Sequence, residues 1–100
     1  MSQINLNENN IIEGKNNQNI IFSGNFGNIN IICSKDETVE DAIKKFCQRR
    51  NEKYNKYLFN KYIFLYNADK INLKKKIREY FDFTPNPRIV VHETNNLLGN

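Results

Sequence analysis

The sequence of 100 residues contains no tryptophan, one histidine, two prolines and two cysteines. The spacing of Cys33 and Cys47 fits neither a zinc ribbon nor a redox pair, so we predict two free thiols in a reducing, intracellular compartment. No leader-like segment precedes them, and no apolar run approaches the roughly 20 residues that a membrane-spanning helix needs. We therefore expect a cytoplasmic protein without a membrane partner, and a nuclear or cytoskeletal location stays open.

Neither sign of charge dominates the sequence. Fifteen Lys and Arg residues face eleven Asp and Glu residues, and the net charge of +4 is spread along the chain with both signs mixed. This balance is typical of a solvated surface and does not by itself indicate a nucleic-acid partner. The high content of Asn, Ile and Lys is attributed to an AT-rich protist genome, so much of the Asn carries no functional message.

The chain does have enough apolar residues for one small core. Hydrophobic residues make up 39% of it, including seven Phe and five Tyr, and a chain of this length forms a single domain. Residues 1–17 are rich in Asn with scattered aliphatic residues, which predicts a flexible arm. We place the domain at residues 18–93 and a tail at residues 94–100.

Two β-favouring runs open the domain, in the stretch "NIIFSGNFGNINIIC" of residues 19–33. Gly24 and Gly27 bracket a short connection, which predicts a hairpin. In the second run Ile29, Ile31 and Cys33 alternate with mostly polar residues. Because side chains alternate across a strand, this pattern predicts a half-buried strand.

The main helix is predicted within "SKDETVEDAIKKFCQRRN", residues 34–51. Thr38 is a natural N-cap, acidic residues occupy the first turn, and Arg49 and Arg50 complement the helix dipole at the end. The apolar positions recur at spacings of three and four: Val39, Ala42, Ile43, Phe46 and Cys47. Residues 51–61 then form a charged connection, with four residues expected to pack back onto the core: Tyr54, Tyr57, Leu58 and Phe59.

The second half of the chain begins with "YIFLYNADKIN", residues 62–72, a strand that ends in a turn-forming cluster. Leu73, Ile77 and Phe81 follow at four-residue steps, which predicts a short helix. "RIVVHE", residues 88–93, is the last predicted strand. The inward faces of these elements predict five core residues: Ile31, Val39, Phe46, Phe64 and Ile89.

The order of these elements is that of the β-grasp, and three segments resemble the ubiquitin family. "DETVEDAIKKF" resembles the start of the ubiquitin helix, and "YIFLYNADKIN" resembles its third strand and the following turn. "IREYFDF" is similar to the stretch before the last strand, with Ile77, Glu79 and Tyr80 in the places of a buried Leu, an Asp and a Tyr. The resemblance covers residues 19–93. It implies an α+β, ubiquitin-like β-grasp with a mixed four- to five-stranded sheet, one main helix and a short second helix.

The resemblance also implies a binding surface, because ubiquitin is recognised mainly through a hydrophobic patch on its exposed sheet face. Leu65 falls at the central aliphatic position of that patch, and Val90 and His92 form the outward pair of the last strand. Phe26 takes the place of the loop residue, and Ile32 extends the surface. His92 replaces an aliphatic residue. The alternative is that Leu65 is one of the scattered surface aliphatics that most proteins carry.

We predict a non-enzymatic adaptor module that binds protein partners and holds no metal or cofactor. The alternative is a small structural subunit of a large intracellular assembly, such as a cytoskeletal or ciliary complex. A nucleophilic pair of Cys47 and His92 is disfavoured, because Cys47 lies on the apolar side of the helix and His92 faces away from it.

A basic surface gives a further alternative, a nucleic-acid binder. Phosphate binding would need the basic clusters on one surface, with aromatic side chains placed to stack on bases. Solvated helical faces explain the same residues, and we favour that explanation. The residues are Lys44, Lys45, Arg49, Arg50, Lys74, Lys75, Lys76 and Arg78.

Overall fold

The computed structural model describes residues 16–82 and 84–94. Most of the predicted arm and tail therefore lies outside the described residues. The first strand begins at Asn17, the last residue of the predicted arm.

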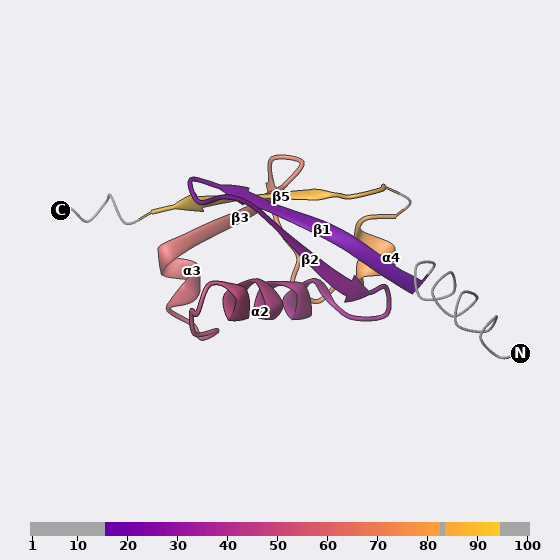
Figure 1. The fold of residues 1–100 in the computed structure, drawn as a ribbon, viewed down its shortest axis with the longest axis horizontal. Coiled ribbons are helices and arrows are strands. Elements are labelled where there is room, and N and C mark those ends of the chain that lie inside the picture. Colours follow the sequence, from indigo (N-terminus) through magenta and orange to yellow (C-terminus); the bar gives the residue numbers. More distant parts are fainter. Residues whose placement is uncertain (1–15, 83, 95–100) are drawn as a thin grey trace, which may run out of the picture.

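Five strands form one mixed sheet (Figure 1). The strands are β1 (Asn17–Gly24), β2 (Gly27–Ser34), β3 (Tyr62–Tyr66), β4 (Asp69–Lys70) and β5 (Arg88–Glu93). Their order across the sheet is β2-β1-β5-β3-β4, with β1 parallel to β5 and the other pairs antiparallel. The short β4 pairs with the end of β3 alone. The predicted fold class is confirmed at its upper strand count.

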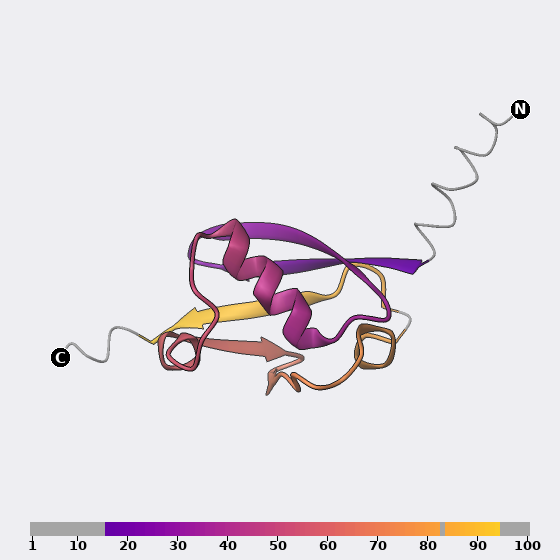
Figure 2. The same ribbon diagram turned by 90° about the horizontal axis from the view of Figure 1, so that it is seen from below.

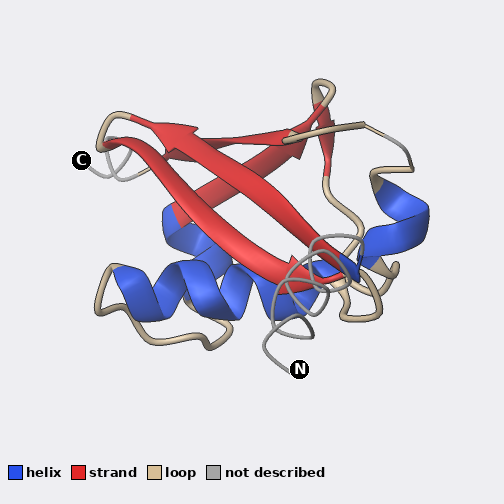
Figure 3. Cartoon of the chain, turned by 45° about the vertical axis from the view of Figure 1, so that its right-hand side comes forward, coloured by secondary structure: helices blue, strands red, loops and turns tan. Residues whose placement is uncertain are grey.

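The helices lie to one side of this sheet. Viewed from that side, the main helix α2 (Val39–Arg49) crosses in front of the strands (Figure 2). Two single-turn helices, α3 (Leu58–Lys61) and α4 (Ile77–Tyr80), stand near the two ends of the sheet (Figure 3). The opposite face of the sheet has no helix over it among the described residues.

The core fills the layer between α2 and the sheet. The five predicted core residues are confirmed as buried, with at most 3% of each exposed. The N-cap of α2 is also confirmed: the backbone N–H of Asp41 donates to Thr38 Oγ1 at 3.2 Å, and the N–H of Thr38 donates to Asp41 Oδ2 at 3.0 Å. This reciprocal capping box fixes the start of the helix.

The helix predicted from Leu73 was placed too early, because α4 begins only at Ile77. The residues before it are hydrogen-bonded to the start of α2 instead. The N–H of Val39 donates to the carbonyl oxygen of Lys75 at 2.9 Å, and that of Glu40 donates to the carbonyl oxygen of Leu73 at 3.1 Å. These bonds satisfy N–H groups that a helix start leaves free, and they fix the segment before α4, which forms a turn at residues 73–74.

The connection before β3 also differs from the prediction. It contains the helical turn α3, which sequence spacing did not reveal because one turn is too short to show a period. Leu58 is buried and Tyr54 packs against the core, as expected. Tyr57, however, is 63% exposed and does not contribute to the core.

Candidate interaction surface

Four side chains lie together on the sheet face that no described helix covers. Ile63 and Leu65 in β3 alternate with buried neighbours, as do Val90 and His92 in β5. The register places Leu65 directly opposite Val90. Ile63 lies opposite His92, one pair further along the outer face. We call these four residues the sheet-face patch.

The patch is partly apolar and partly accessible. Val90 is 36% exposed. His92 is exposed, whereas the two β3 side chains are half-buried. Neighbouring residues on one face of a sheet lie about 5 Å apart, so the four side chains form a continuous surface.

A polar group adjoins the patch on its β1 side. Ser23 lies beside Val90 in the pairing of β1 with β5, and its Oγ donates to Asn28 Oδ1 at 2.8 Å. Arg88 Nη1 donates to Ser23 Oγ at 3.1 Å and to Asn28 Oδ1 at 3.3 Å. This network orients a guanidinium group next to the apolar residues. Sequence reasoning missed it, although the alternation of Arg88 with the buried Ile89 already places Arg88 on the outer face.

Phe26 does not join the sheet-face patch, so that part of the predicted surface needs correction. Its ring lies 5.5 Å from the ring of Phe46 in α2, and the Arg50 guanidinium stands 4.5 Å from it. The tight two-residue connection between β1 and β2 turns the side chain toward the helix layer. A side chain at Gly24 would come within 2.8 Å of the Phe26 ring, so the glycine permits this packing.

Ile32 lies on the outer face but apart from the patch. It is 61% exposed in β2, at the far edge of the sheet. Three strand spacings separate β2 from β3, which corresponds to about 14 Å. The structure therefore brings together Leu65, Val90 and His92 from the predicted set, adds Ile63, and leaves Phe26 and Ile32 outside.

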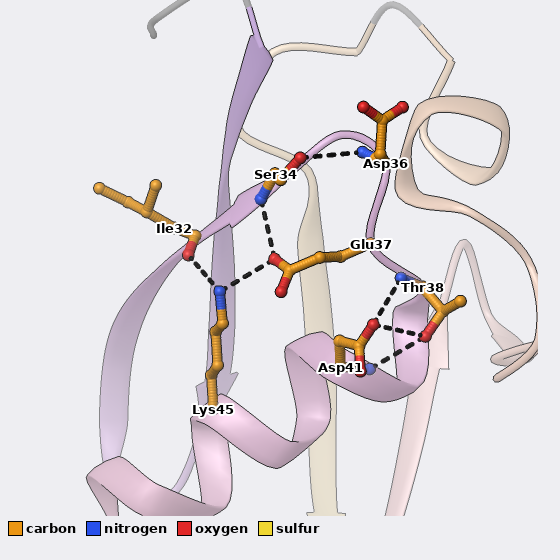
Figure 4. Close-up of polar contacts among 7 residues, drawn as sticks. All are labelled: Ile32, Ser34, Asp36, Glu37, Thr38, Asp41 and Lys45. Carbon is orange, nitrogen blue, oxygen red and sulfur yellow. Dashed lines mark hydrogen bonds and ion pairs between the residues drawn. The ribbon is translucent and has the colours of Figure 1, made fainter.

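The basic residues of α2 are largely committed to contacts within the domain. Lys45 Nζ lies 2.9 Å from Glu37 Oε1 and donates to the carbonyl oxygen of Ile32 at 3.3 Å (Figure 4). Arg49 Nη1 donates to the carbonyl oxygen of Asn30 at 3.0 Å. Both side chains thus reach from the helix to the outer edge of β2.

The remaining basic residues are divided between those that contact other side chains of the domain and those that stay exposed. Arg78 Nη2 lies 2.7 Å from Asp36 Oδ1, and Arg50 Nε lies 3.6 Å from Glu52 Oε2. Lys44 Nζ stands 5.4 Å from the ring centre of Tyr54. The exposed side chains of Lys74, Lys75 and Lys76 belong to the segment bonded to the start of α2. Ion pairs therefore reduce the charge that these basic residues offer to phosphate.

The two cysteines face the core and carry no exposed thiol. Burial raises the pKa of both Cys33 and Cys47 to about 11, which keeps them protonated and weakly nucleophilic. His92 lies on the outer face of the sheet, whereas Cys47 lies in α2 behind the inner face. The sheet separates the two groups, so they cannot form a catalytic pair.

Within residues 16–82 and 84–94, no cluster of three or more His, Cys, Asp or Glu side chains is arranged to hold a metal ion. None of the described helices is long and apolar enough to cross a membrane.

Comparison with known proteins identifies the fold. No protein-family profile matches the sequence, and no curated protein matches it. A solved structure from work described as "Molecular Mimicry of SUMO promotes DNA repair" superimposes with a TM-score of 0.62. The match covers 76% of this chain and 90% of that one, at 10% sequence identity. The chain therefore has a ubiquitin-like β-grasp fold, and an identity this low supports the fold alone.

Proposed function

We propose that this protein is a non-enzymatic, ubiquitin-like interaction module that binds a protein partner through the sheet-face patch. The observation that carries the proposal is the pairing of Leu65 with Val90 on the uncovered face. The inner face of the sheet is occupied by the core and α2. The outer face is therefore the face of the sheet that remains available to a partner.

The composition of this face supports a protein partner. An apolar centre next to a polar rim is the usual anatomy of a protein interface. Here Val90 and Leu65 would supply the centre, and Arg88 with its hydrogen-bond partners would supply the rim. Arg side chains that are already oriented lose little conformational freedom on binding, which is one reason why Arg is frequent among the strongest interface contacts.

The proposal is tested with Leu65→Ala and a charge-reversal control. Partners are captured from the source cell on the wild-type protein, on Leu65→Ala, and on Lys44→Glu combined with Lys75→Glu. We expect Leu65→Ala to melt nearly normally and to lose affinity at least about tenfold, which is 1.4 kcal/mol. The charge reversal should leave the same partner bound.

The opposite result would overturn the proposal. If the charge reversal abolishes binding in a strongly salt-dependent way and Leu65→Ala does not, the basic surface is the contact and an acidic partner or nucleic acid is favoured.

A stable subunit of a larger assembly is the second candidate function. It is favoured by exposed apolar side chains away from the patch, since Ile32 is 61% exposed and Tyr57 63% exposed. A subunit would bury several faces at once, whereas an adaptor would bind transiently through one. The native size of the complex in a cell extract distinguishes them: migration near 11.9 kDa supports the adaptor, and co-migration with a large particle supports the subunit.

A further inference from the structure

A second surface feature lies at the edge of the sheet, where β4 stops. β3 has five residues and β4 only two, so in the part of the chain that the structure describes no strand pairs with the first three residues of β3 on that side. A hollow of about 160 Å³ occupies this place, which we call the edge notch. Its lining is mostly apolar and consists of Phe59, Tyr62, Ile63, Phe64, Lys70, Ile71 and Leu73.

Two residues of β3 direct their backbone groups toward the edge notch. The N–H of Thr94 donates to the carbonyl oxygen of Lys61 at 2.9 Å, which fixes the hydrogen-bonding alternation between β3 and β5. Tyr62 and Phe64 consequently direct their carbonyl groups away from β5 and toward the notch. The N–H of Ile71 donates to the Phe64 oxygen at 3.2 Å, whereas the Tyr62 oxygen has no backbone donor among the described residues.

The size and charge of the edge notch define what could occupy it. A hollow of about 150 Å³ lined by aliphatic and aromatic groups accommodates one benzene ring, so the notch accommodates one leucine or phenylalanine side chain. Lys70 is the single charged residue in the lining. It is exposed and has no ion-pair partner within the described residues, so a carboxylate is the complementary group.

We propose that the edge notch binds an extended acidic segment of a partner protein, which places one apolar side chain in the hollow and a carboxylate beside Lys70. An extended segment fits because it can follow an incomplete strand edge and offer an N–H group to the Tyr62 oxygen. The edge notch shares Ile63 with the sheet-face patch, but its lining contains none of Leu65, Val90 and His92. It does not depend on the proposed function.

A blocked pentapeptide, Thr-Glu-Leu-Glu-Thr, is the probe. Binding is followed by amide chemical shifts in NMR spectra of the full chain, with a Kd expected at about 1 mM for one small side chain and one exposed ion pair. Shifts should concentrate at the residues that line the notch. Thr-Glu-Ala-Glu-Thr should bind at least about fivefold more weakly, because it lacks the anchor side chain.

Lys70→Glu tests the charge, since Lys70 is exposed and its substitution leaves the core intact. It should weaken the acidic peptide about three- to fivefold and should favour Thr-Lys-Leu-Lys-Thr instead. Val90→Ala is the matched control and should not change peptide binding. If Val90→Ala weakens the peptide as much as Lys70→Glu does, the peptide binds the sheet-face patch and the notch proposal is wrong.

Two other results would also overturn the proposal. The first is the absence of shifts at the notch amides at a peptide concentration of about 5 mM, several times the expected Kd. The second concerns the tail of this chain, whose attachment point at Thr94 is bonded to the start of β3. If Leu97→Ser with Leu98→Ser shifts the notch amides without any peptide, the chain's own tail occupies the notch.

Discussion

The rings of Phe22 in β1 and Phe46 in α2 stack with their centres 4.6 Å apart and 22° between their planes. Phe46 also meets Phe64 edge to face at 5.8 Å. It therefore joins the main helix to two separate strands of the sheet. Aromatic contacts of this geometry add about 0.5 to 1.5 kcal/mol each beyond the burial of area.

Phe46→Ala is expected to cost about 3 to 5 kcal/mol of unfolding free energy, because it removes these contacts and leaves a cavity. A domain of this size has little stability to spare, so the variant should be largely unfolded near physiological temperature. Denaturant titration followed by circular dichroism measures the loss. Phe59→Ala is the control: Phe59 is 38% exposed, and its loss should cost about 1 kcal/mol. Equal losses for the two variants would contradict the central place of Phe46.

The core could be predicted from the sequence because its apolar residues follow a helical period in α2 and a strand period in the sheet. Val39 and Phe46 recur at helical spacing, whereas Ile31 and Ile89 alternate at strand spacing, and burial follows directly from such patterns. The start of α2 was predictable for a similar reason. A Thr with an acidic residue three positions later is a local signal that needs no tertiary information.

The features that could not be predicted correctly from the sequence depend on contacts between distant segments. The spacing of Leu73 and Ile77 is compatible with a helix. However, backbone N–H groups at the start of α2 form hydrogen bonds with the carbonyl groups of residues around Leu73. Phe26 lies in a loop, where neither periodicity applies, and its direction is set by α2. The edge notch exists because β4 is only two residues long, and no sequence pattern indicates where the pairing of β3 with β4 stops.

The turn between β3 and β4 contains a strained alanine. Asn67 and Ala68 have φ angles of 54° and 70°, as a two-residue hairpin turn of the left-handed kind requires. Asn tolerates this conformation, whereas for Ala it costs roughly 1 to 2 kcal/mol. Ala68→Gly should therefore stabilise the protein by about 0.5 to 1 kcal/mol, after the larger entropy of glycine in the unfolded chain is deducted.

Thermal unfolding would detect the effect of Ala68→Gly as a Tm increase of a few degrees. Asn67→Gly is the matched control at the neighbouring position. It should change the unfolding free energy by only a few tenths of a kcal/mol, because Asn already accepts a positive φ. A destabilised Ala68→Gly variant would show that the turn is not under strain.

Glu52 makes the stability of the domain depend on acid. Partial burial opposes its ionisation, but hydrogen bonds from Tyr62 and Lys61 outweigh that effect and lower the pKa of Glu52. A carboxyl with a lowered folded pKa contributes stability that is fully present above its unfolded pKa, near 4.3, and is lost as the pH falls toward the folded pKa. The Asp41 carboxyl, whose pKa is lowered by the Thr38 backbone N–H, acts in the same direction.

The Glu52→Gln variant separates this contribution from the rest. It should be less stable than the wild type at pH 7 and should lose less unfolding free energy between pH 5 and about 3. Denaturant midpoints across this range give both quantities. Glu79→Gln, a change at an exposed carboxyl without an ion pair among the described residues, is the control and should follow the wild-type curve. Parallel curves for wild type and Glu52→Gln would remove Glu52 as a source of acid sensitivity.

The outer edge of β2 is expected to remain unpaired because α2 covers it. Lys45 and Arg49 donate to the carbonyl oxygens of Ile32 and Asn30, and Glu37 accepts from the N–H of Ser34 at 2.9 Å. These are backbone groups that would otherwise pair with another strand. Charged side chains along an exposed edge are a common means of preventing such association.

Lys45→Met combined with Arg49→Met should therefore increase self-association, because two edge carbonyls lose their donors and two charges disappear. Each backbone hydrogen bond made by a second copy of β2 would contribute about 0.5 to 1.5 kcal/mol, so we expect association about tenfold stronger or more. Light scattering after size-exclusion chromatography at rising protein concentration measures it. Lys44→Met combined with Lys53→Met removes the same charge from exposed positions that make no bond to β2, and it should stay monomeric to the same extent as the wild type. Association by both double variants alike would indicate that net charge, and not the covered edge, keeps the copies apart.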